Sequence, residues 1–572
     1  MNQRLQFGDY VLEPMLQRVT CAGAIVPLKP KTFDLLCLLL ANRERVVSKE
    51  ELLDWLWPRQ VVSEGNLSQA VYELRRALDD TARPAELIRN VPRRGYRFAG
   101  EVRPVDEALE QRVPRSIAVL PFRSLGTTDE DAHLGLGIAD AIITRLARTG
   151  GMVVRPLSAG ARFVTPELDA LTAGRRLEVD CVVEGTIQLA AGQLRASGRL
   201  LRVADGACLW ADGLTLPAEE VFEMQDRLAA GVVAATVQQP APAKGSQRRR
   251  EAENPEVHTL YLKGRYCWYK WTPPAFFQAV EYLQQAIALD PSHAPSHAFL
   301  AGAWSTLAIY GVLPPREAFA AARAAATRAV ELAPAMSEGH EMLGAVQLFF
   351  DWEPAAAMRS LDRAIELDPD SCNARHLLAL ALAQGGRHAA AMAELQRVLR
   401  ADPLALISHT DVGFLHYWNR DFDAALAASE ATLKLEAGFA HVHLLRAYAL
   451  SALGRAAEAS EAMDKSLALG GRSPMLSGDR AYILGRAGDA TEARSIIAAL
   501  QEEARHRYVD PFAVALGYLG LGERDPFFKW LERAAENRSR DLVFLAVLPV
   551  MDAVRDDPRF AAFIDQHLLA KY

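Results

Sequence analysis

The first hundred residues alternate between short apolar runs and helical patterns. Residues 5–12 and 24–28 have the length and composition of strands, so we expect a small amino-terminal sheet. Two helices should follow. The second begins after Ser48, which forms a capping box with Glu51, and ends at Trp57. The first carries apolar residues at helical spacing, namely Phe33, Leu35, Leu36, Leu39 and Leu40.

A third helix is predicted between residues 63 and 78. Its apolar residues form one stripe, which consists of Leu67, Val71, Leu74 and Leu78. Its remaining faces carry polar, charged or aromatic side chains, namely Asn66, Ser68, Gln69, Tyr72, Glu73, Arg75 and Arg76. A helix of this kind fits the major groove of duplex DNA.

A tight hairpin should follow the third helix. The segment 90–95 contains a proline, which fixes one backbone angle, and a glycine, which permits a positive one. Tyr96 and Phe98 are two residues apart, so both should pack inward. Four arginines lie near the tip, and they could neutralise phosphates or enter a minor groove. They are Arg89, Arg93, Arg94 and Arg97.

The pattern changes after a polar linker at residues 104–114. Residues 115–237 mix strand and helix patterns, which predicts an α/β domain. Strands are expected at 116–122, 152–154, 181–187, 193–204 and 207–210, and helices at 137–148 and 217–237. The residues Gly135-Leu136-Gly137 form either a phosphate loop or a packing turn, and the missing third glycine of a dinucleotide fingerprint favours packing.

Four charged residues of this middle domain are candidates for a small-ligand cleft, although solvated charges or helix-end pairs explain them equally well. They are Asp140, Arg145, Glu184 and Asp212. A second linker, residues 238–256, is proline-rich and then basic. Its run Arg248–Arg250 either contacts DNA or is a solvated hinge.

Residues 257–572 repeat a pattern with a period of 34. Gly386, Arg420, Gly454, Gly488 and Gly522 stand at this spacing. Segments such as Ala286–Pro291 and Ala364–Pro369 end one helix pair and start the next. The period is that of tetratricopeptide repeats, so we expect about eight units stacked into an all-α solenoid, with an insertion near residues 310–315.

Charge is distributed unevenly between these parts. Residues 1–103 carry 16 Lys and Arg against 13 Asp and Glu, a net charge of +3, whereas the whole chain of 572 residues carries −7. A contact with nucleic acid is therefore expected in residues 1–103. An arginine-rich helix and turn is often only a solvated surface, so the charge by itself does not decide the function.

The order of elements at the amino terminus resembles a known family. The segments PLKPKTFDLLCLLLANRERVVSKEELLDWLWP, LSQAVYELRRALDD and VPRRGYRF are similar to the OmpR-type winged-helix DNA-binding domain, especially in CadC/ToxR-like regulators. The resemblance implies that residues 66–76 enter a major groove and that residues 93–97 touch the adjacent backbone or minor groove. Glu73 departs from the arginine-rich helices of some members: it either accepts from a cytosine amino group or pairs with Arg76, and we favour pairing.

Two further resemblances concern the rest of the chain. The segments IAVLPF, GIADAIITRLAR, VVEGTIQ and GACLWAD resemble TolB amino-terminal-like domains, for which no catalytic residue set is implied. Residues 257–572 are similar to tetratricopeptide domains, which bind a peptide or a partner helix. Aromatic clusters at residues 266–271 and 414–418 are candidates for an anchor pocket, although packing between repeats explains them better.

Targeting signals and metal sites are not expected. No run reaches the roughly 18 apolar residues of a membrane helix, and the start lacks an apolar signal region, so we expect a cytoplasmic protein without a membrane contact. The six cysteines lack CxxC pairs and should be reduced, buried thiols. We expect no cofactor and no metal.

The leading hypothesis is a bacterial transcription regulator with a winged helix, an α/β middle domain and a repeat solenoid. Phosphates would be bound by Arg75, Arg76, Arg93, Arg94 and Arg97, and bases would be read by Asn66, Gln69 or Tyr72. The other two domains would receive a signal from a protein, peptide or small molecule. The family resemblance leads us to expect a homodimer on DNA. The alternative is a scaffold whose winged helix does not bind DNA; an enzyme is not expected, since no nucleophile–base constellation or Walker loop is present.

Overall fold

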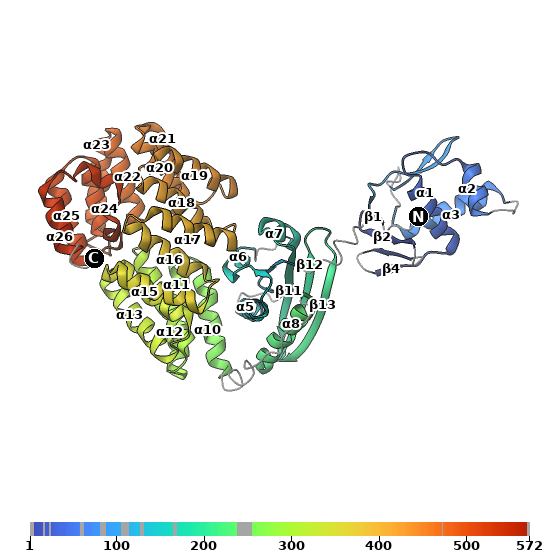
Figure 1. The fold of residues 1–572 in the computed structure, drawn as a ribbon, viewed down its shortest axis with the longest axis horizontal. Helices are drawn as coiled ribbons and strands as arrows, with labels where there is room; N and C mark the ends of the chain where they lie inside the picture. Colours follow the sequence, from blue (N-terminus) through green and yellow to red (C-terminus); the bar gives the residue numbers. More distant parts are fainter. Residues whose placement is uncertain are drawn as a thin grey trace. The chain divides into compact units, whose positions relative to one another are not determined.

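The computed structural model describes residues 5–14, 18–21, 24–57, 62–80, 87–104, 114–125, 131–163, 169–236, 254–471 and 473–568. They form two compact units, labelled by element in Figure 1. The amino-terminal unit comprises Met1–Pro114 with Asp205–Leu209, and the carboxy-terminal unit comprises the rest of the chain. The domain boundaries at residues 103, 114, 237 and 256 remain predictions.

The amino-terminal unit begins with an antiparallel sheet. Its strands lie in the order β4 (Ala24–Val26), β3 (Arg18–Cys21), β2 (Tyr10–Glu13), β1 (Leu5–Phe7) and β7 (Arg103–Pro104). The prediction of a single strand over residues 5–12 was wrong, because Gly8 has φ +56° and turns the chain between β1 and β2. The strand β3 was not predicted at all.

Three helices follow, and they agree with the predicted pattern. They are α1 (Pro30–Ala41), α2 (Lys49–Leu56) and α3 (Glu64–Ala77). The apolar stripes predicted for α1 and α3 are buried in one core, together with Tyr96 and Phe98 of the hairpin. The Ser48 hydroxyl accepts the Glu51 backbone N–H at 3.1 Å, which confirms the predicted start of α2. The Glu51 carboxylate pairs with Arg45.

The middle domain is a mixed sheet with helices against it. The sheet order is β10 (Val153–Val154), β8 (Ser116–Val119), β11 (Cys181–Ala190), β12 (Gln193–Arg202) and β13 (Cys208–Pro217), with β9 (Arg123–Ser124) paired to β11. The helices are α5 (Ala132–Thr149), α6 (Leu157–Ala161), α7 (Ala170–Arg176) and α8 (Val221–Thr236). The strand predicted at 207–210 extends to ten residues, and α6 and α7 were not predicted.

Gly135 and Gly137 lie inside α5, which begins at Ala132, five residues before the helix predicted from residue 137. A Cβ on Gly135 would come within 1.9 Å of the Phe122 carbonyl oxygen, and one on Gly137 within 2.6 Å of the Leu262 side chain. Both glycines therefore permit close packing. The prediction that these glycines serve packing was right, but the prediction that they form a turn was wrong, because both lie within a helix.

The described part of residues 254–568 contains eight helix pairs, drawn from green to red in Figure 1. The pairs are α10 (Pro255–Tyr269) with α11 (Pro273–Leu289), α12 (Ala294–Ile309) with α13 (Pro315–Leu332), α14 (Ser337–Val346) with α15 (Pro354–Leu367), α16 (Cys372–Gln384) with α17 (His388–Ala401), α18 (Leu406–Trp418) with α19 (Phe422–Leu435), α20 (Ala440–Ala452) with α21 (Ala456–Gly470), α22 (Pro474–Ala487) with α23 (Ala490–Glu503), and α24 (Pro511–Gly520) with α25 (Arg524–Asn537). The 34-residue steps of the sequence mark the turn inside each later pair.

The turn residue of every pair has a positive φ. Those recognised in the sequence are Gly386, Arg420, Gly454, Gly488 and Gly522, and the structure adds Trp271, Gly311 and Trp352 for the first three pairs. The period was invisible in the first pairs because two of these residues are tryptophans and because the insertion before Pro315 lengthens one turn. Backbone geometry is thus conserved along the array where residue identity is not.

A side chain–backbone contact fixes the turns between pairs. Four histidine Nε2 atoms lie 2.8 to 3.1 Å from the carbonyl oxygen six residues earlier; they belong to His297, His340, His409 and His443. Arg375 makes the same contact to Pro369, at 3.1 Å. These histidines therefore have a structural role.

Among the described residues, the middle domain contacts the repeats around α10 and at the end of α17. In the first, α10 packs against α5, and Arg265 forms a bidentate ion pair with Asp140 at 2.8 and 3.0 Å. In the second, the Arg155 guanidinium donates to the Arg400 and Ala401 carbonyls at the end of α17, while Leu404 is buried in the middle-domain core. The two parts therefore form one unit.

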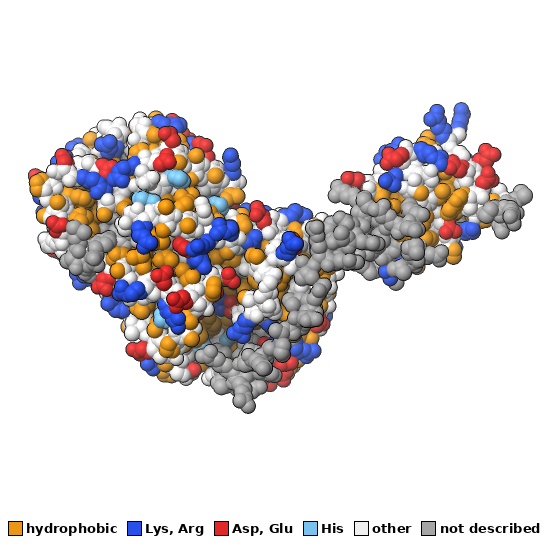
Figure 2. Space-filling model, viewed as in Figure 1, with side chains coloured by type: hydrophobic (Ala, Val, Ile, Leu, Met, Phe, Trp, Pro, Cys, Tyr) orange, Lys and Arg blue, Asp and Glu red, His pale blue; other side chains and the backbone are white. Residues whose placement is uncertain are grey.

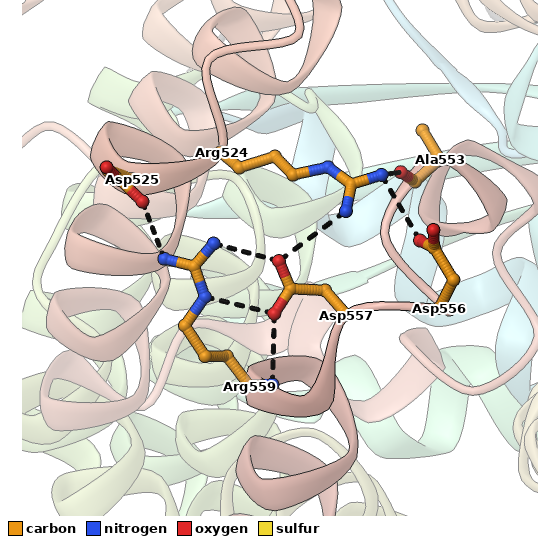
Figure 3. Close-up of polar contacts among 6 residues, drawn as sticks. All are labelled: Arg524, Asp525, Ala553, Asp556, Asp557 and Arg559. Carbon is orange, nitrogen blue, oxygen red and sulfur yellow. Dashed lines mark hydrogen bonds and ion pairs between the residues drawn. The ribbon is translucent and has the colours of Figure 1, made fainter.

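The carboxy-terminal residues close the array. After α25, the Phe544 ring stacks on Trp418 at 5.1 Å, and Asp552 pairs with both guanidinium ends of Arg420. A polar cluster then joins α26 (Pro558–His567) to α25 (Figure 3). In it Asp557 accepts from Arg559 at 2.8 Å, and this hydrogen bond lowers the pKa of the Asp557 carboxyl to about 2.

The sequence predicts no membrane-spanning helix and six buried, reduced thiols. Within the described ranges, no helix has the length and apolar character needed to cross a membrane. All six cysteines are free thiols, but the expectation that they are buried was wrong for Cys208, which is exposed. Cys181 and Cys267 are buried and the other three are half-buried.

Candidate nucleic-acid interface

The outward face of α3 is a seam of residues three and four apart. Gln69, Tyr72 and Arg76 are exposed along it, and the Tyr72 side chain is 60% accessible to solvent. Asn66 is exposed on one flank of the seam. Ser68 is exposed on the other, where its hydroxyl donates to the Glu64 carbonyl of its own helix at 3.1 Å. The seam presents an amide, a phenol and a guanidinium to a partner.

Glu73 lies at the edge of this seam, where its carboxylate accepts hydrogen bonds from a lysine and from a glutamine amide. Its Oε1 atom accepts from Lys29 Nζ at 2.8 Å and from Gln69 Nε2 at 3.3 Å. The hydrogen bond from Lys29, followed by that from Gln69, lowers the pKa of the Glu73 carboxyl. The favoured pairing with Arg76 was therefore wrong: the cation is Lys29, which precedes α1.

Arg75 lies on a different side of α3 from the seam. Its Nε and Nη2 atoms donate to the carbonyl oxygen of Ile88 at 3.1 and 2.6 Å, so the guanidinium is half-buried against the hairpin. Asp80 completes this joint, since its carboxylate accepts the backbone N–H groups of Leu87 and Ile88 at 3.1 and 2.8 Å. The helix and the hairpin are thereby held together as one surface.

Replacing Asp80 with alanine should weaken this joint. The Asp80 side chain is buried, and its loss leaves two backbone N–H groups without their acceptor, so we expect a cost of about 2–3 kcal/mol. Hydrogen exchange of peptides covering residues 64–98 should accelerate. The matched control is Asp54→Ala, at an exposed position of α2, which should leave exchange unchanged. Equal exchange in both variants would show that Asp80 does not fix the hairpin.

The hairpin predicted at residues 87–98 is present as β5 (Ile88–Val91) and β6 (Gly95–Phe98). Arg89 and Arg97 lie directly opposite each other in its register, and both are exposed. Like charges at such a position are unfavourable by roughly 0.2–1 kcal/mol in the free protein. Arg93 and Arg94 are exposed at the tip, where Arg93 has φ +60°. This concentration of positive charge suits an anionic partner.

A close backbone contact fixes the hairpin next to its tip. Val47 exchanges backbone hydrogen bonds with Tyr96, each of 2.9 Å. A Cβ on Gly95 would lie 1.9 Å from the Val47 carbonyl oxygen, and Gly95 also has φ +137°, so glycine is required here for two reasons. On the face shown in Figure 2, basic side chains project from one end of the amino-terminal unit.

The structure thus brings most of the predicted residues onto one helix face and one hairpin. Two predicted residues are not available on this surface in the same way. Arg75 joins α3 to the hairpin, and Glu73 is paired with Lys29. Sequence reasoning missed Lys29, Val47 and Asp80, because each acts through a partner distant in the chain or through backbone geometry. The sole available signal was Asp80 itself, an acidic residue just after a helix end.

The four middle-domain candidates do not share a partner. Asp140 pairs with Arg265 of α10, Arg145 donates to the Asp226 carbonyl at 3.1 Å, and Glu184 pairs with Arg199 on the neighbouring strand. Asp212 is exposed on β13 and accepts the Gly213 N–H. Asp212 fits the predicted solvated charges. Asp140 lies in the middle of α5 and pairs with the buried Arg265, which is neither a solvated charge nor a helix-end pair.

The aromatic clusters of the repeats are mainly core. Tyr417 and Trp418 are buried, and Trp268 donates through its indole N–H to Thr306 at 3.1 Å. Trp271 is the exception, since 53% of its surface is accessible. The packing interpretation is confirmed for Tyr417 and Trp418.

Three segments match families of known proteins. Residues 23–98 match the carboxy-terminal domain of transcriptional regulatory proteins. Residues 113–231, which resemble TolB amino-terminal-like domains, match the second domain of HilA/YgeH-like transcriptional regulators, and residues 373–403 match a tetratricopeptide repeat. The predicted combination of an OmpR-type domain with tetratricopeptide repeats is confirmed, and the middle segment carries a HilA-like regulator domain.

Individual relatives extend over different parts of the chain. The transcriptional regulator HilA of Salmonella typhi is 22% identical over 429 residues, which are 74% of this chain and 75% of HilA. A Rhizobium meliloti protein named "Putative adenylate cyclase 3" is 29% identical over 188 residues, which are 32% of each protein. The solved DNA-binding domain of Escherichia coli CadC is 28% identical, with a TM-score of 0.17, and the match covers 18% of this chain and 97% of that domain.

Proposed function

We propose that this chain, which carries an OmpR-type DNA-binding domain, a HilA-like regulator domain and tetratricopeptide repeats, regulates transcription by binding promoter DNA and a protein or peptide partner. The α3 seam would enter the major groove, and the β5–β6 hairpin would contact the phosphates beside it. The activity is binding, without a chemical step. The cyclase relative shares too little of its own length to assign its activity to this chain.

The observation that carries the proposal is the joint geometry of α3 and the hairpin. An exposed amide–tyrosine–arginine seam stands beside a hairpin whose Arg89 and Arg97 oppose each other, and Arg75 and Asp80 fix one element to the other. Unfavourable like-charge contacts become favourable when a phosphate lies between them. A solvated surface or a protein-binding scaffold would not need this arrangement.

Roles for individual residues follow from their positions. Gln69, Tyr72 and Asn66 are proposed to contact bases, and Arg76, Arg89, Arg93, Arg94 and Arg97 to contact phosphates. Arg75 is proposed to position the hairpin. A homodimer on DNA and a cytoplasmic location also stay predictions from the sequence.

Genomic selection tests the proposal. The purified full chain is incubated with sheared genomic duplex, and the retained fragments are sequenced beside those of a Gln69→Ala/Tyr72→Ala variant. We expect a recurring site that the variant loses while it still retains DNA at low salt. Retention of no duplex by either protein would favour the scaffold function.

Neutralising the hairpin tip should change the salt dependence of binding. Arg93→Ala/Arg94→Ala should reduce the slope of log affinity against log salt by about two, because each lost phosphate contact reduces it by about one. Fluorescence anisotropy of a labelled duplex between about 50 and 300 mM salt measures the slope. Arg93→Lys/Arg94→Lys keeps both charges and should keep the wild-type slope. An unchanged slope in the alanine variant would remove the tip from the interface.

A further inference from the structure

The Glu73 carboxylate links the start of α1 to the reading face of α3. One oxygen, Oε1, accepts both Lys29 Nζ at 2.8 Å and Gln69 Nε2 at 3.3 Å. Lys29 is the residue that precedes α1, and Gln69 lies one helical turn before Glu73. The three side chains therefore form a chain of contacts that ends at an exposed residue of the seam.

This contact fixes the orientation of the Gln69 amide. A carboxylate accepts hydrogen bonds and cannot donate one, so the amide nitrogen of Gln69 must face Glu73. The nitrogen keeps a second N–H, and the carbonyl oxygen is not used by Glu73. A donor and an acceptor side by side are what adenine requires, since its major-groove edge presents N7 as acceptor and N6 as donor.

Holding the amide in place also removes an entropic cost. A glutamine side chain loses rotamer freedom when it is fixed, and here part of that loss occurs before any ligand is bound. Glu73 itself is less suited to reading a base. Its carboxylate already accepts from Lys29 and Gln69 and has a further side-chain hydrogen bond with Thr32, and its side chain is 28% exposed.

We propose that Glu73 is a positioning residue, which holds the Gln69 amide in the orientation that selects adenine in the major groove, with Lys29 holding Glu73. The inference rests on the proposed function. It predicts that one base position of the target site depends on a side chain that does not touch that base.

The test compares base preferences of full-length variants. Selection from random duplexes gives the preference of the wild-type chain at each position, and Gln69→Ala identifies the position that Gln69 reads. We expect the wild-type chain to prefer adenine there by about tenfold or more. In Glu73→Ala this preference should fall at least about fivefold at that position alone, with thermal stability and salt slope unchanged.

Two further variants separate positioning from charge. Glu73→Gln removes the same negative charge but keeps an oxygen that accepts from Gln69, so it should retain most of the adenine preference. Glu64→Ala is the matched control, because Glu64 is also on α3 and also pairs with a lysine, Lys49 at 2.6 Å, but it has no contact with Gln69 among those the structure describes. It should leave the preference unchanged.

The outcomes are distinct. A uniform change of affinity in Glu73→Ala and Glu73→Gln, with the adenine preference intact, would overturn the inference and leave the proposed function standing. The same holds if Gln69→Ala alters a position that Glu73→Ala does not. If the wild-type chain binds no duplex, the proposed function fails and this inference fails with it.

Discussion

Replacing Arg265 with methionine should lower the free energy of unfolding of the carboxy-terminal unit by about 3 kcal/mol. Arg265 is 6% exposed and forms the bidentate pair with Asp140, so its removal leaves a carboxylate at a packed interface without its cation. The guanidinium also lies 5.4 Å from the Tyr261 ring and 4.9 Å from the Phe299 ring, and these contacts are lost as well.

Urea denaturation of the full chain measures this loss, with hydrogen exchange in α5 and α10 locating it. Arg265→Lys keeps the charge but loses the bidentate geometry, so its cost should be intermediate. The double variant Arg265→Met/Asp140→Asn should recover part of the stability, because no unpaired charge remains. A loss below about 1 kcal/mol in Arg265→Met would show that the first repeat is not anchored to the middle domain through this pair.

The second large effect concerns Glu341. Replacing it with glutamine should change the free energy of unfolding by an amount that depends on pH. Glu341 on α14 is 8% exposed, and burial raises the pKa of its carboxyl to about 7. In the unfolded chain a glutamate has a pKa of about 4.3. Between these values the folded state binds more protons than the unfolded state, so the stability that Glu341 contributes is complete below about pH 4 and is lost as the pH rises through about 7.

A glutamine at position 341 is neutral at every pH and does not suffer this loss. As the pH rises from 5 to 8, the difference in the free energy of unfolding between Glu341→Gln and the wild type should therefore shift by about 2–3 kcal/mol in favour of the variant. Asp557→Asn is the control, because the pKa of Asp557 is about 2 and its carboxylate stays ionised over the same range. Urea midpoints at several pH values give both differences. A difference for Glu341→Gln that does not change with pH would contradict the assigned burial.

The interface elements were predictable because local chemistry determines them. Ser48 caps α2, the stripe from Leu67 to Leu78 defines α3, and a glycine followed by alternating aromatic residues defines β6. The 34-residue period likewise appeared in the later pairs, where four of the five turn residues are glycine and the fifth is Arg420. It was hidden at Trp271 and Trp352, since a positive φ at a tryptophan has no sequence signature.

The contacts that finish the site were not predictable, because they join residues far apart in the chain. Glu73 faces Lys29 and not its helical neighbour Arg76, since α1 packs across α3. Arg75 reaches the Ile88 carbonyl, so a residue that looks like a phosphate contact becomes a joint. In the same way, the two anchors of the middle domain on the repeats, at Arg265 and Arg155, depend on tertiary packing that no periodicity reveals.

Footprinting on a site recovered by genomic selection tests the central claim most directly. The full chain is bound at saturation to the duplex, and dimethyl sulfate and hydroxyl radicals report on groove and backbone access. Guanine N7 atoms in the major groove should be protected from dimethyl sulfate where α3 lies, with adjacent backbone protection that Arg93→Ala/Arg94→Ala removes. Saturated binding without major-groove protection, or with backbone protection that the double variant keeps, would contradict it.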